Sequence, residues 1–129
     1  MQLKPSYLDV TTDVLDFFKG KIQQCLSAGI GSLIIDPGFG FGKSIEHNYK
    51  LVNDFEIFIS MGYPVLTGFS RKSMIYKLLD VTPEQSLNGT TILNTIAIMK
   101  GTSILRVHDV LEAKECLTIN SVLKGYITN

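Results

Sequence analysis

The sequence predicts an α/β fold in which parallel strands are joined by helical crossovers. Three short apolar runs, at residues 32–35, 64–68 and 103–107, alternate with longer segments whose apolar residues recur at helical spacing. The first run is apolar without alternation, which is typical of a strand covered on both faces. Because strands and helices take turns along the chain, we expect one parallel sheet with helices packed against it.

The first predicted helix covers residues 9–28, after a short extended start around Pro5. Its apolar residues recur every three or four positions, and Gly29 follows as a stop signal. Gly20 inside this segment costs about 0.5–1 kcal/mol relative to alanine, and the apolar stripe outweighs that cost.

The second predicted helix is capped by Ser44 and extends to about Ser60. A short helix over residues 74–79 follows the second strand. The residues Thr82-Pro83-Glu84-Gln85 read as an N-cap, a proline at the first helical position and a capping-box glutamine. They predict a third helix that extends to about Lys100, with Asn88-Gly89 as a possible weak point.

The last predicted helix runs from Asp109 to about Lys124, and Asp109 with Glu112 forms a second capping box at its start. No low-complexity segment or linker interrupts the pattern. A chain of 129 residues with 45% hydrophobic content can bury one core. We therefore expect one domain, or a piece of one.

The balance of charge argues against nucleic acid as a partner. Lys and Arg number 12, as do Asp and Glu, and no basic stripe is present. No apolar run is long enough to cross a bilayer, and the N-terminus lacks a signal-peptide pattern. Cys25 and Cys116 fall on apolar faces of predicted helices, where two reduced thiols are favoured over a disulfide. We therefore expect a cytoplasmic protein that contacts no membrane.

Charged residues gather where each predicted strand ends. Asp36 follows the first strand, Arg71 and Lys72 follow the second, and Arg106 and His108 close the third. The carboxyl ends of parallel strands meet at one edge of a sheet, which is where ligands bind in this fold class. One carboxylate, three cations and a histidine on a common rim suit a ligand with one donor-rich face and a polyanionic part.

Each of these residues also has a purely structural interpretation. Asp36 before Pro37 is a good turn former, Arg71 and Lys72 suit a solvated loop, and Asp109 serves as a helix cap. His108 suits a structural hydrogen bond, and His47 on the second helix is best explained as a surface residue. The repetition of charge at three strand ends favours a site, because chance would scatter these residues.

The segment between Asp36 and Lys43, the glycine loop, resembles two nucleotide-binding patterns but fits neither. Gly42-Lys43-Ser44 matches the second half of a P-loop, yet Pro37 stands where that pattern begins with glycine. Proline offers no N–H to a phosphate and cannot adopt a positive φ. The three glycines also miss the G-x-G-x-x-G spacing of dinucleotide-binding folds. Phe39 and Phe41 instead suggest a loop that covers the interior or binds a flat ligand.

Three motifs together resemble dihydropteroate synthase over essentially the whole chain. They are Asp36-Pro-Gly-Phe-Gly-Phe-Gly-Lys43, Gly68-Phe-Ser-Arg-Lys-Ser73 and Arg106-Val-His-Asp-Val110, in this order. The resemblance implies a (β/α)8 TIM barrel that joins dihydropterin pyrophosphate to p-aminobenzoate, releasing pyrophosphate and giving dihydropteroate for folate synthesis. That family is the target of sulfonamides.

The resemblance also implies roles for individual residues. Asp36, Lys72 and Arg106 would bind the pterin, with the carboxylate accepting two parallel N–H bonds. Arg106 and His108 would contact the pyrophosphate. Phe41 and Ser73 would contact p-aminobenzoate. No residue is implied as a nucleophile.

A barrel of this type takes about 250 residues, which is about twice this chain. The resemblance implies that the chain begins near the helix after strand five and contains strands six to eight, the carboxyl-terminal half. It implies Mg²⁺ as cofactor, with its asparagine ligand in the missing amino-terminal half and no metal ligand here. We expect a half of this kind to be inactive alone, and to form a homo-oligomer or pair with a missing half-barrel, because its strand edges are unpaired. The alternative is a non-catalytic pterin- or phosphate-binding fragment, or a scaffold.

Overall fold

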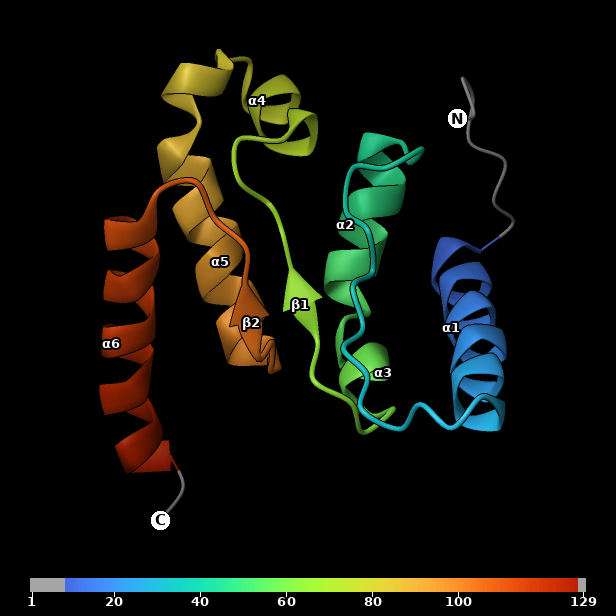
Figure 1. Cartoon of the computed structure of the whole chain (residues 1–129). Helices are drawn as coiled ribbons and strands as arrows, with labels where there is room; N and C mark the ends of the chain where they lie inside the picture. Colours follow the sequence, from blue (N-terminus) through green and yellow to red (C-terminus); the bar gives the residue numbers. More distant parts are fainter. Residues whose placement is uncertain (1–8, 128–129) are drawn as a thin grey trace.

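The computed structural model describes residues 9–127, and the expected extended start around Pro5 lies outside that range. Helices and a small parallel sheet alternate along the chain, as the sequence predicts (Figure 1). The elements are α1 (Val10–Ser27), α2 (Ile45–Asn53), α3 (Glu56–Ile59), β1 (Leu66–Thr67), α4 (Ser73–Leu79), the 3-10 turn η1 (Pro83–Gln85), α5 (Leu87–Lys100), β2 (Ile104–Leu105) and α6 (Val110–Ile127).

The strands are parallel but shorter than the sequence suggests. Leu66 pairs with Ile104 and Thr67 with Leu105. The first predicted strand is reduced to one parallel bridge, between Ile35 and Val65. Its neighbour Ile34 is 58% exposed, so the expectation of a strand covered on both faces is wrong within the described chain.

The segment predicted as one helix over residues 44–60 is two helices, α2 and α3. The break falls at Asp54, whose carboxylate accepts from Thr11 Oγ1 at 2.6 Å and from the ammonium of Lys50. Phe55 follows it and turns its ring into the core, where it is 1% exposed. Tertiary contacts to α1 and the core therefore outweigh the helical periodicity at this point.

The third predicted helix also begins later than expected. Thr82 and Gln85 form the predicted capping box, but it closes the single turn η1, and α5 starts at Leu87. Gly89 is a close-packing point rather than a weak one, because a Cβ there would lie 2.9 Å from Leu79 Cδ1 and would overlap Ile75.

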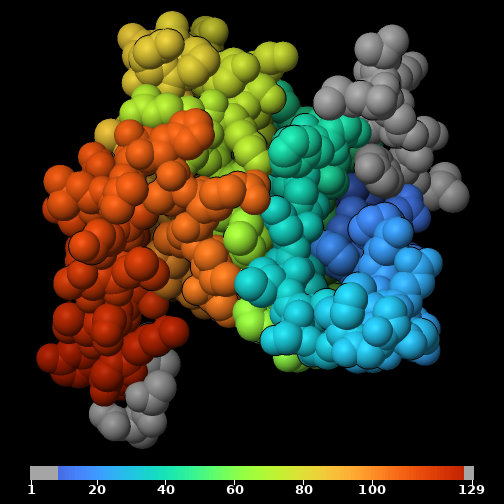
Figure 2. Space-filling model, in the orientation of Figure 1, coloured from blue at the N-terminus to red at the C-terminus, as the bar shows by residue number. Residues whose placement is uncertain are grey.

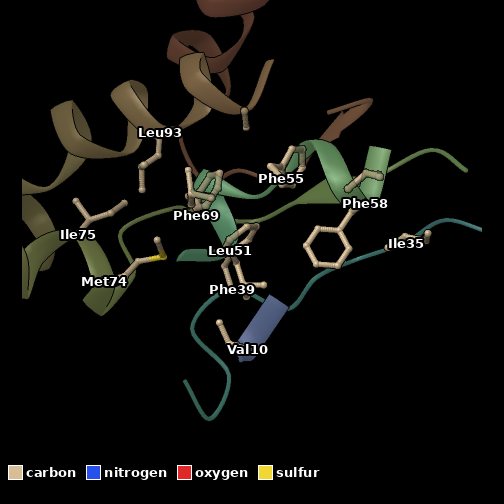
Figure 3. Packing of buried hydrophobic residues seen from close by; sticks show 13 residues of the cluster. Val10, Ile35, Phe39, Leu51, Phe55, Phe58, Phe69, Met74, Ile75 and Leu93 are labelled. Atoms are coloured by element: carbon tan, nitrogen blue, oxygen red, sulfur yellow. The ribbon is translucent and has the colours of Figure 1, made fainter. Parts of the chain in front are cut away.

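The core lies among helices α1 to α5 and the first two strand segments (Figure 3). Four phenylalanines carry much of it, and each is at most 1% exposed: Phe39, Phe55, Phe58 and Phe69. The rings of Phe39 and Phe69 approach to 4.5 Å between centroids, which joins the glycine loop to the segment after β1. The core thus fixes the backbone of two loops that leave the carboxyl ends of neighbouring strands.

The helices form a chain of neighbours around the sheet. Helix α1 packs on α2, α2 on α4, α4 on α5, and α5 on α6 (Figure 1). Within residues 9–127 no helix is both long and apolar enough to cross a membrane. Cys25 and Cys116 are both free thiols, as expected, but each is half-buried where the sequence predicts a buried thiol.

Candidate functional site

The carboxyl ends of the three strand segments meet, and a salt bridge joins the outer two. Arg106 Nη1 donates to Asp36 Oδ2 at 2.9 Å, across 70 positions of sequence. In Figure 2 the orange segment after β2 lies against the cyan segment that carries the glycine loop, next to the green of β1. The predicted convergence of Asp36 with Arg106 at one edge of a parallel sheet is therefore observed.

The backbone of the glycine loop orients the carboxylate of Asp36. Its Oδ1 accepts from the N–H of Gly38 at 2.9 Å, which leaves Oδ2 facing Arg106. The Arg106 guanidinium reaches across the end of β1, where a Cβ on Gly68 would lie only 2.5 Å from its Nη2. Glycine at position 68 therefore makes room for the guanidinium, a feature that its place in the sequence motif does not reveal.

Lys72 lies between the glycine loop and Arg106. Its Nζ donates to the carbonyl of Phe39 at 2.6 Å and stands 4.9 Å from the ring centroid of Phe41. Burial lowers the pKa of Lys72, repulsion from Arg106 lowers it further, and attraction to Asp36 opposes both. Because the position is half-buried and cationic, an anionic group entering beside Lys72 meets a poorly hydrated ammonium.

The two phenylalanines of the glycine loop divide the two roles that the sequence left open. Phe39 is fully buried and belongs to the core. Phe41 is 61% exposed, and its ring faces the ammonium of Lys72. Phe41 therefore presents a free aromatic face at the rim, as the expected contact with p-aminobenzoate requires.

Two side chains that sequence reasoning missed hold the glycine loop in shape. Asn48 is 2% exposed, accepts from the N–H of Gly40 at 2.7 Å and donates to the Ser44 carbonyl at 2.9 Å. Lys43 Nζ donates to the carbonyls of Gly38 at 2.8 Å and Phe41 at 3.2 Å. Burial lowers the pKa of Lys43. The available signal for Asn48 in the sequence was an asparagine one turn after the helix cap Ser44, where its side chain can bond back to the backbone.

Lys43 thus binds carbonyl groups of its own loop, which is unlike the phosphate-facing lysine of a P-loop. Together with Asp36 it also lines a cavity of about 390 Å³ between α1 and the glycine loop. Within residues 9–127 no group of three His, Cys, Asp or Glu side chains could hold a metal ion.

Arg71 does not act as a free rim cation. Its Nε and Nη2 donate to the two carboxylate oxygens of Asp109 at 3.1 and 2.9 Å, and its Nη1 donates to the carbonyls of Pro83 and Glu84. The alternative interpretation of Arg71 as a solvated loop charge is therefore wrong, and so is the expectation that Asp109 is a helix cap with no further role. Of the three predicted rim cations, Lys72 and Arg106 remain directed at the site.

Ser73 and His108 are sequence neighbours of the rim residues Lys72 and Arg106. Ser73 is the first residue of α4, directly after Lys72. His108 is exposed, and its backbone N–H donates to Ser70 Oγ at 3.0 Å. The main chain therefore ties the end of the third strand segment to the loop that carries Lys72 and Ser73.

The resulting rim combines an oriented carboxylate, two cations and an exposed aromatic ring. A carboxylate of this kind can accept paired N–H groups from a planar heterocycle, and a neighbouring guanidinium can stack on such a ring or bind phosphate. The arrangement fits recognition and charge stabilisation. It contains no nucleophile paired with a base.

Comparison with known proteins agrees with this geometry. The family model described as pterin binding enzyme matches residues 1–108. The dihydropteroate synthase of Haemophilus influenzae is 48% identical over 121 residues, which are 92% of this chain and 44% of that protein. The enzyme of Escherichia coli is 45% identical, over 92% of this chain and 43% of that protein. The chain thus spans less than half the length of these relatives.

Solved structures agree as well. The dihydropteroate synthase of Yersinia pestis superposes with a TM-score of 0.92 at 42% identity, over 97% of this chain and 52% of that one. The enzyme of Thermus thermophilus, solved in complex with 4-aminobenzoate, gives a TM-score of 0.88 at 40% identity, over 92% of this chain and 49% of that one. The family model, these relatives and the convergence of Asp36 with Arg106 lead to one conclusion: the chain belongs to the pterin-binding enzyme family.

Proposed function

We propose that this chain supplies the carboxyl-terminal half of a dihydropteroate synthase, about strands six to eight of a (β/α)8 barrel. The reaction is the condensation of dihydropterin pyrophosphate with p-aminobenzoate to give dihydropteroate and pyrophosphate. The observation that carries the proposal is the Asp36–Arg106 contact across the end of β1, with Lys72 beside it. Relatives solved with a sulfonamide drug and with 4-aminobenzoate support the choice of ligands.

In this proposal the pterin takes the place that Arg106 occupies at Asp36. The ring N–H and the amino N–H each donate to one oxygen of the carboxylate, and Oδ1 also keeps its bond from the N–H of Gly38. The guanidinium of Arg106 then stacks on the pterin face, and the ammonium of Lys72 lies along the ring. Two parallel charge-assisted bonds give orientation as well as affinity.

The chemistry of the proposed site is electrostatic. Arg106 and His108 stabilise the negative charge of the departing pyrophosphate, and Phe41 and Ser73 position p-aminobenzoate so that its amine attacks the pterin methylene carbon. The C–N bond forms as the C–O bond to pyrophosphate breaks, and the amine proton leaves to solvent. Positioning and charge stabilisation account for such a step without a covalent intermediate. By family resemblance Mg²⁺, when bound, would supply further positive charge for the leaving group, and we assign it to no residue of this chain.

The isolated chain is proposed to be inactive in a steady-state assay, since half of the barrel would be absent. The pairing described for Ile35 and β2 leaves one edge of each without a strand partner among residues 9–127. Such edges favour pairing with the missing half-barrel or with a second copy of the chain. Light scattering measures the assembly of the chain alone and with an amino-terminal half of a relative, and a steady-state synthase assay of the same samples measures their activity. Restored synthase activity in the mixture supports the proposal, and full activity of the chain alone contradicts it.

Calorimetric titration with a non-hydrolysable pterin pyrophosphate analogue tests the site itself. We expect binding by the unmodified chain, no binding by Asp36→Asn, and weaker binding by Arg106→Ala. Asp16→Asn, which removes an exposed carboxylate on α1, is the matched control and retains binding. If the unmodified chain takes up no analogue, the second candidate stands, namely a scaffold fragment without a working site.

The two free thiols of Cys25 and Cys116 support the cytoplasm as the proposed compartment.

A further inference from the structure

Arg71 occupies a junction where three loops meet. It follows β1, and its side chain spans to the start of α6 and to the turn η1. The fork of its guanidinium binds Asp109 through Nε at 3.1 Å and Nη2 at 2.9 Å, which is a bidentate pair. Its Nη1 donates to the carbonyls of Pro83 at 3.0 Å and Glu84 at 2.7 Å.

The backbone at Arg71 is held as firmly as its side chain. Arg71 adopts a φ of 53°, which is uncommon for a residue other than glycine. Its N–H donates to Thr90 Oγ1 at 3.0 Å, and that hydroxyl donates to the Ser86 carbonyl at 2.9 Å. Thr90 and Ser86 are both at most 2% exposed, so the anchor for this unusual backbone lies in the interior.

These contacts set the relative position of the two segments that carry the proposed ligand residues. Lys72 and Ser73 directly follow Arg71, while His108 lies one residue and Arg106 three residues before Asp109. A second link runs in parallel, from the His108 N–H to Ser70 Oγ at 3.0 Å. The ion pair therefore ties one loop of proposed ligand residues to the other, while the guanidinium itself bonds to Asp109 and to two backbone carbonyls.

We propose that Arg71 and Asp109 form a positioning pair, which holds Lys72 on one loop and Arg106 and His108 on the next in register for one anionic ligand. The inference rests on the proposed function for the nature of that ligand, pyrophosphate or a pyrophosphate ester. It assigns to Arg71 an indirect role, through the backbone of two loops, instead of direct contact with phosphate.

Two single variants and their combination test the pair. Asp109→Asn keeps the shape and removes the charge, and Arg71→Lys keeps the charge and removes the fork. Glu56→Gln is the matched control, because it breaks the ion pair of Glu56 with Lys100 (2.8 Å), which joins α3 to α5 away from the rim. Each variant of the 129-residue chain is titrated with inorganic pyrophosphate, and its thermal unfolding is measured in parallel.

We expect each single variant to bind pyrophosphate roughly ten- to a hundredfold more weakly, the cost of displacing positioned groups by about an ångström. The double variant should lose no more than the worse single one, because both changes break the same link. Glu56→Gln should bind as the unmodified chain does. Unchanged affinity in Asp109→Asn, or an equal loss in Glu56→Gln, would overturn the proposal.

Amide hydrogen exchange of His108 and Lys72 gives a readout that needs no ligand. Release of the two loops in Asp109→Asn should speed exchange at both amides by about tenfold, with no such change in Glu56→Gln. If the unmodified chain binds no pyrophosphate, the proposed function fails for this fragment. The positioning pair is then decided by exchange alone: faster exchange at both amides supports it, and retained protection refutes it.

Discussion

The guanidinium of Arg106 binds the carboxylate of Asp36, so that two residues proposed to bind the same ligand form an ion pair with each other. The pair is open to water, with the side chains of Arg106 and Asp36 51% and 35% exposed. Exposed ion pairs contribute about 0–1 kcal/mol to stability. The contribution of this ion pair to the stability of the fold is therefore small. Its place at the edge where the carboxyl ends of the strand segments meet favours a role in ligand binding.

Asp36→Asn should accordingly leave stability almost unchanged while abolishing binding of a pterin analogue. We expect the free energy of unfolding to change by about 0.5 kcal/mol or less. Urea denaturation and calorimetric titration of the same preparation check both halves. A loss of several kcal/mol in stability would show that the carboxylate serves the fold instead.

Two glycines in helix interiors should respond in opposite directions to alanine. Gly20 in α1 has open space where a Cβ would stand, so Gly20→Ala should stabilise the chain by about 0.5–1 kcal/mol. At Gly89 the new Cβ would press on Ile75, which is 1% exposed, and on Leu79. Gly89→Ala should therefore destabilise the chain by about 1–3 kcal/mol, as overpacking does. Thermal unfolding of the two variants side by side measures the contrast.

Asn48→Ala should destabilise the glycine loop. The change strands the N–H of Gly40 without its acceptor, which costs about 1–3 kcal/mol for a buried group. Asn53→Ala, at an exposed position of the same helix, should stay within about 0.5 kcal/mol. Equal effects in the two variants, measured by chemical denaturation, would mean that the loop does not depend on the Asn48 amide.

The Arg71–Asp109 ion pair should weaken only when the pH falls below about 4. The guanidinium holds the pKa of Asp109 below its ordinary value of 3.8 in the folded chain. A carboxyl whose pKa is depressed by folding stabilises the fold above its unfolded pKa, and that contribution is lost as pH falls through the folded pKa. The difference in melting temperature between the unmodified chain and Asp109→Asn should thus be constant above about pH 5 and shrink below about pH 4. A difference that persists undiminished at lower pH would contradict this.

The sequence predicted the meeting of Asp36 with Arg106 because that meeting follows from topology alone. Parallel strands bring their carboxyl ends to one edge whatever the side chains are. The different roles of Arg71, which binds Asp109, and Lys72, which faces the rim, were not predictable in the same way. Both are cations in one loop, and only the positions of Asp109 and Phe39, distant in sequence, decide which of them faces the rim.

The glycine loop shows the same limit. Phe39 and Phe41 have equivalent surroundings in the sequence, yet one ring fills the core beside Phe69 and the other lies exposed. The break between α2 and α3 likewise depends on Thr11, which bonds to Asp54 across 43 positions. Local periodicity holds no information about such a contact, so a single helix was the natural expectation there.

The uneven distribution of charge has a kinetic consequence. The chain is neutral as a whole, yet Lys43, Lys72 and Arg106 gather near the carboxylate of Asp36 at one edge. Such an excess attracts a polyanion before any contact is made, and dissolved ions weaken that attraction over about 10 Å at 0.1 M. Encounter with a phosphorylated ligand should therefore slow as ionic strength rises, while uptake of an uncharged heterocycle should proceed at the same speed in dilute and concentrated buffer.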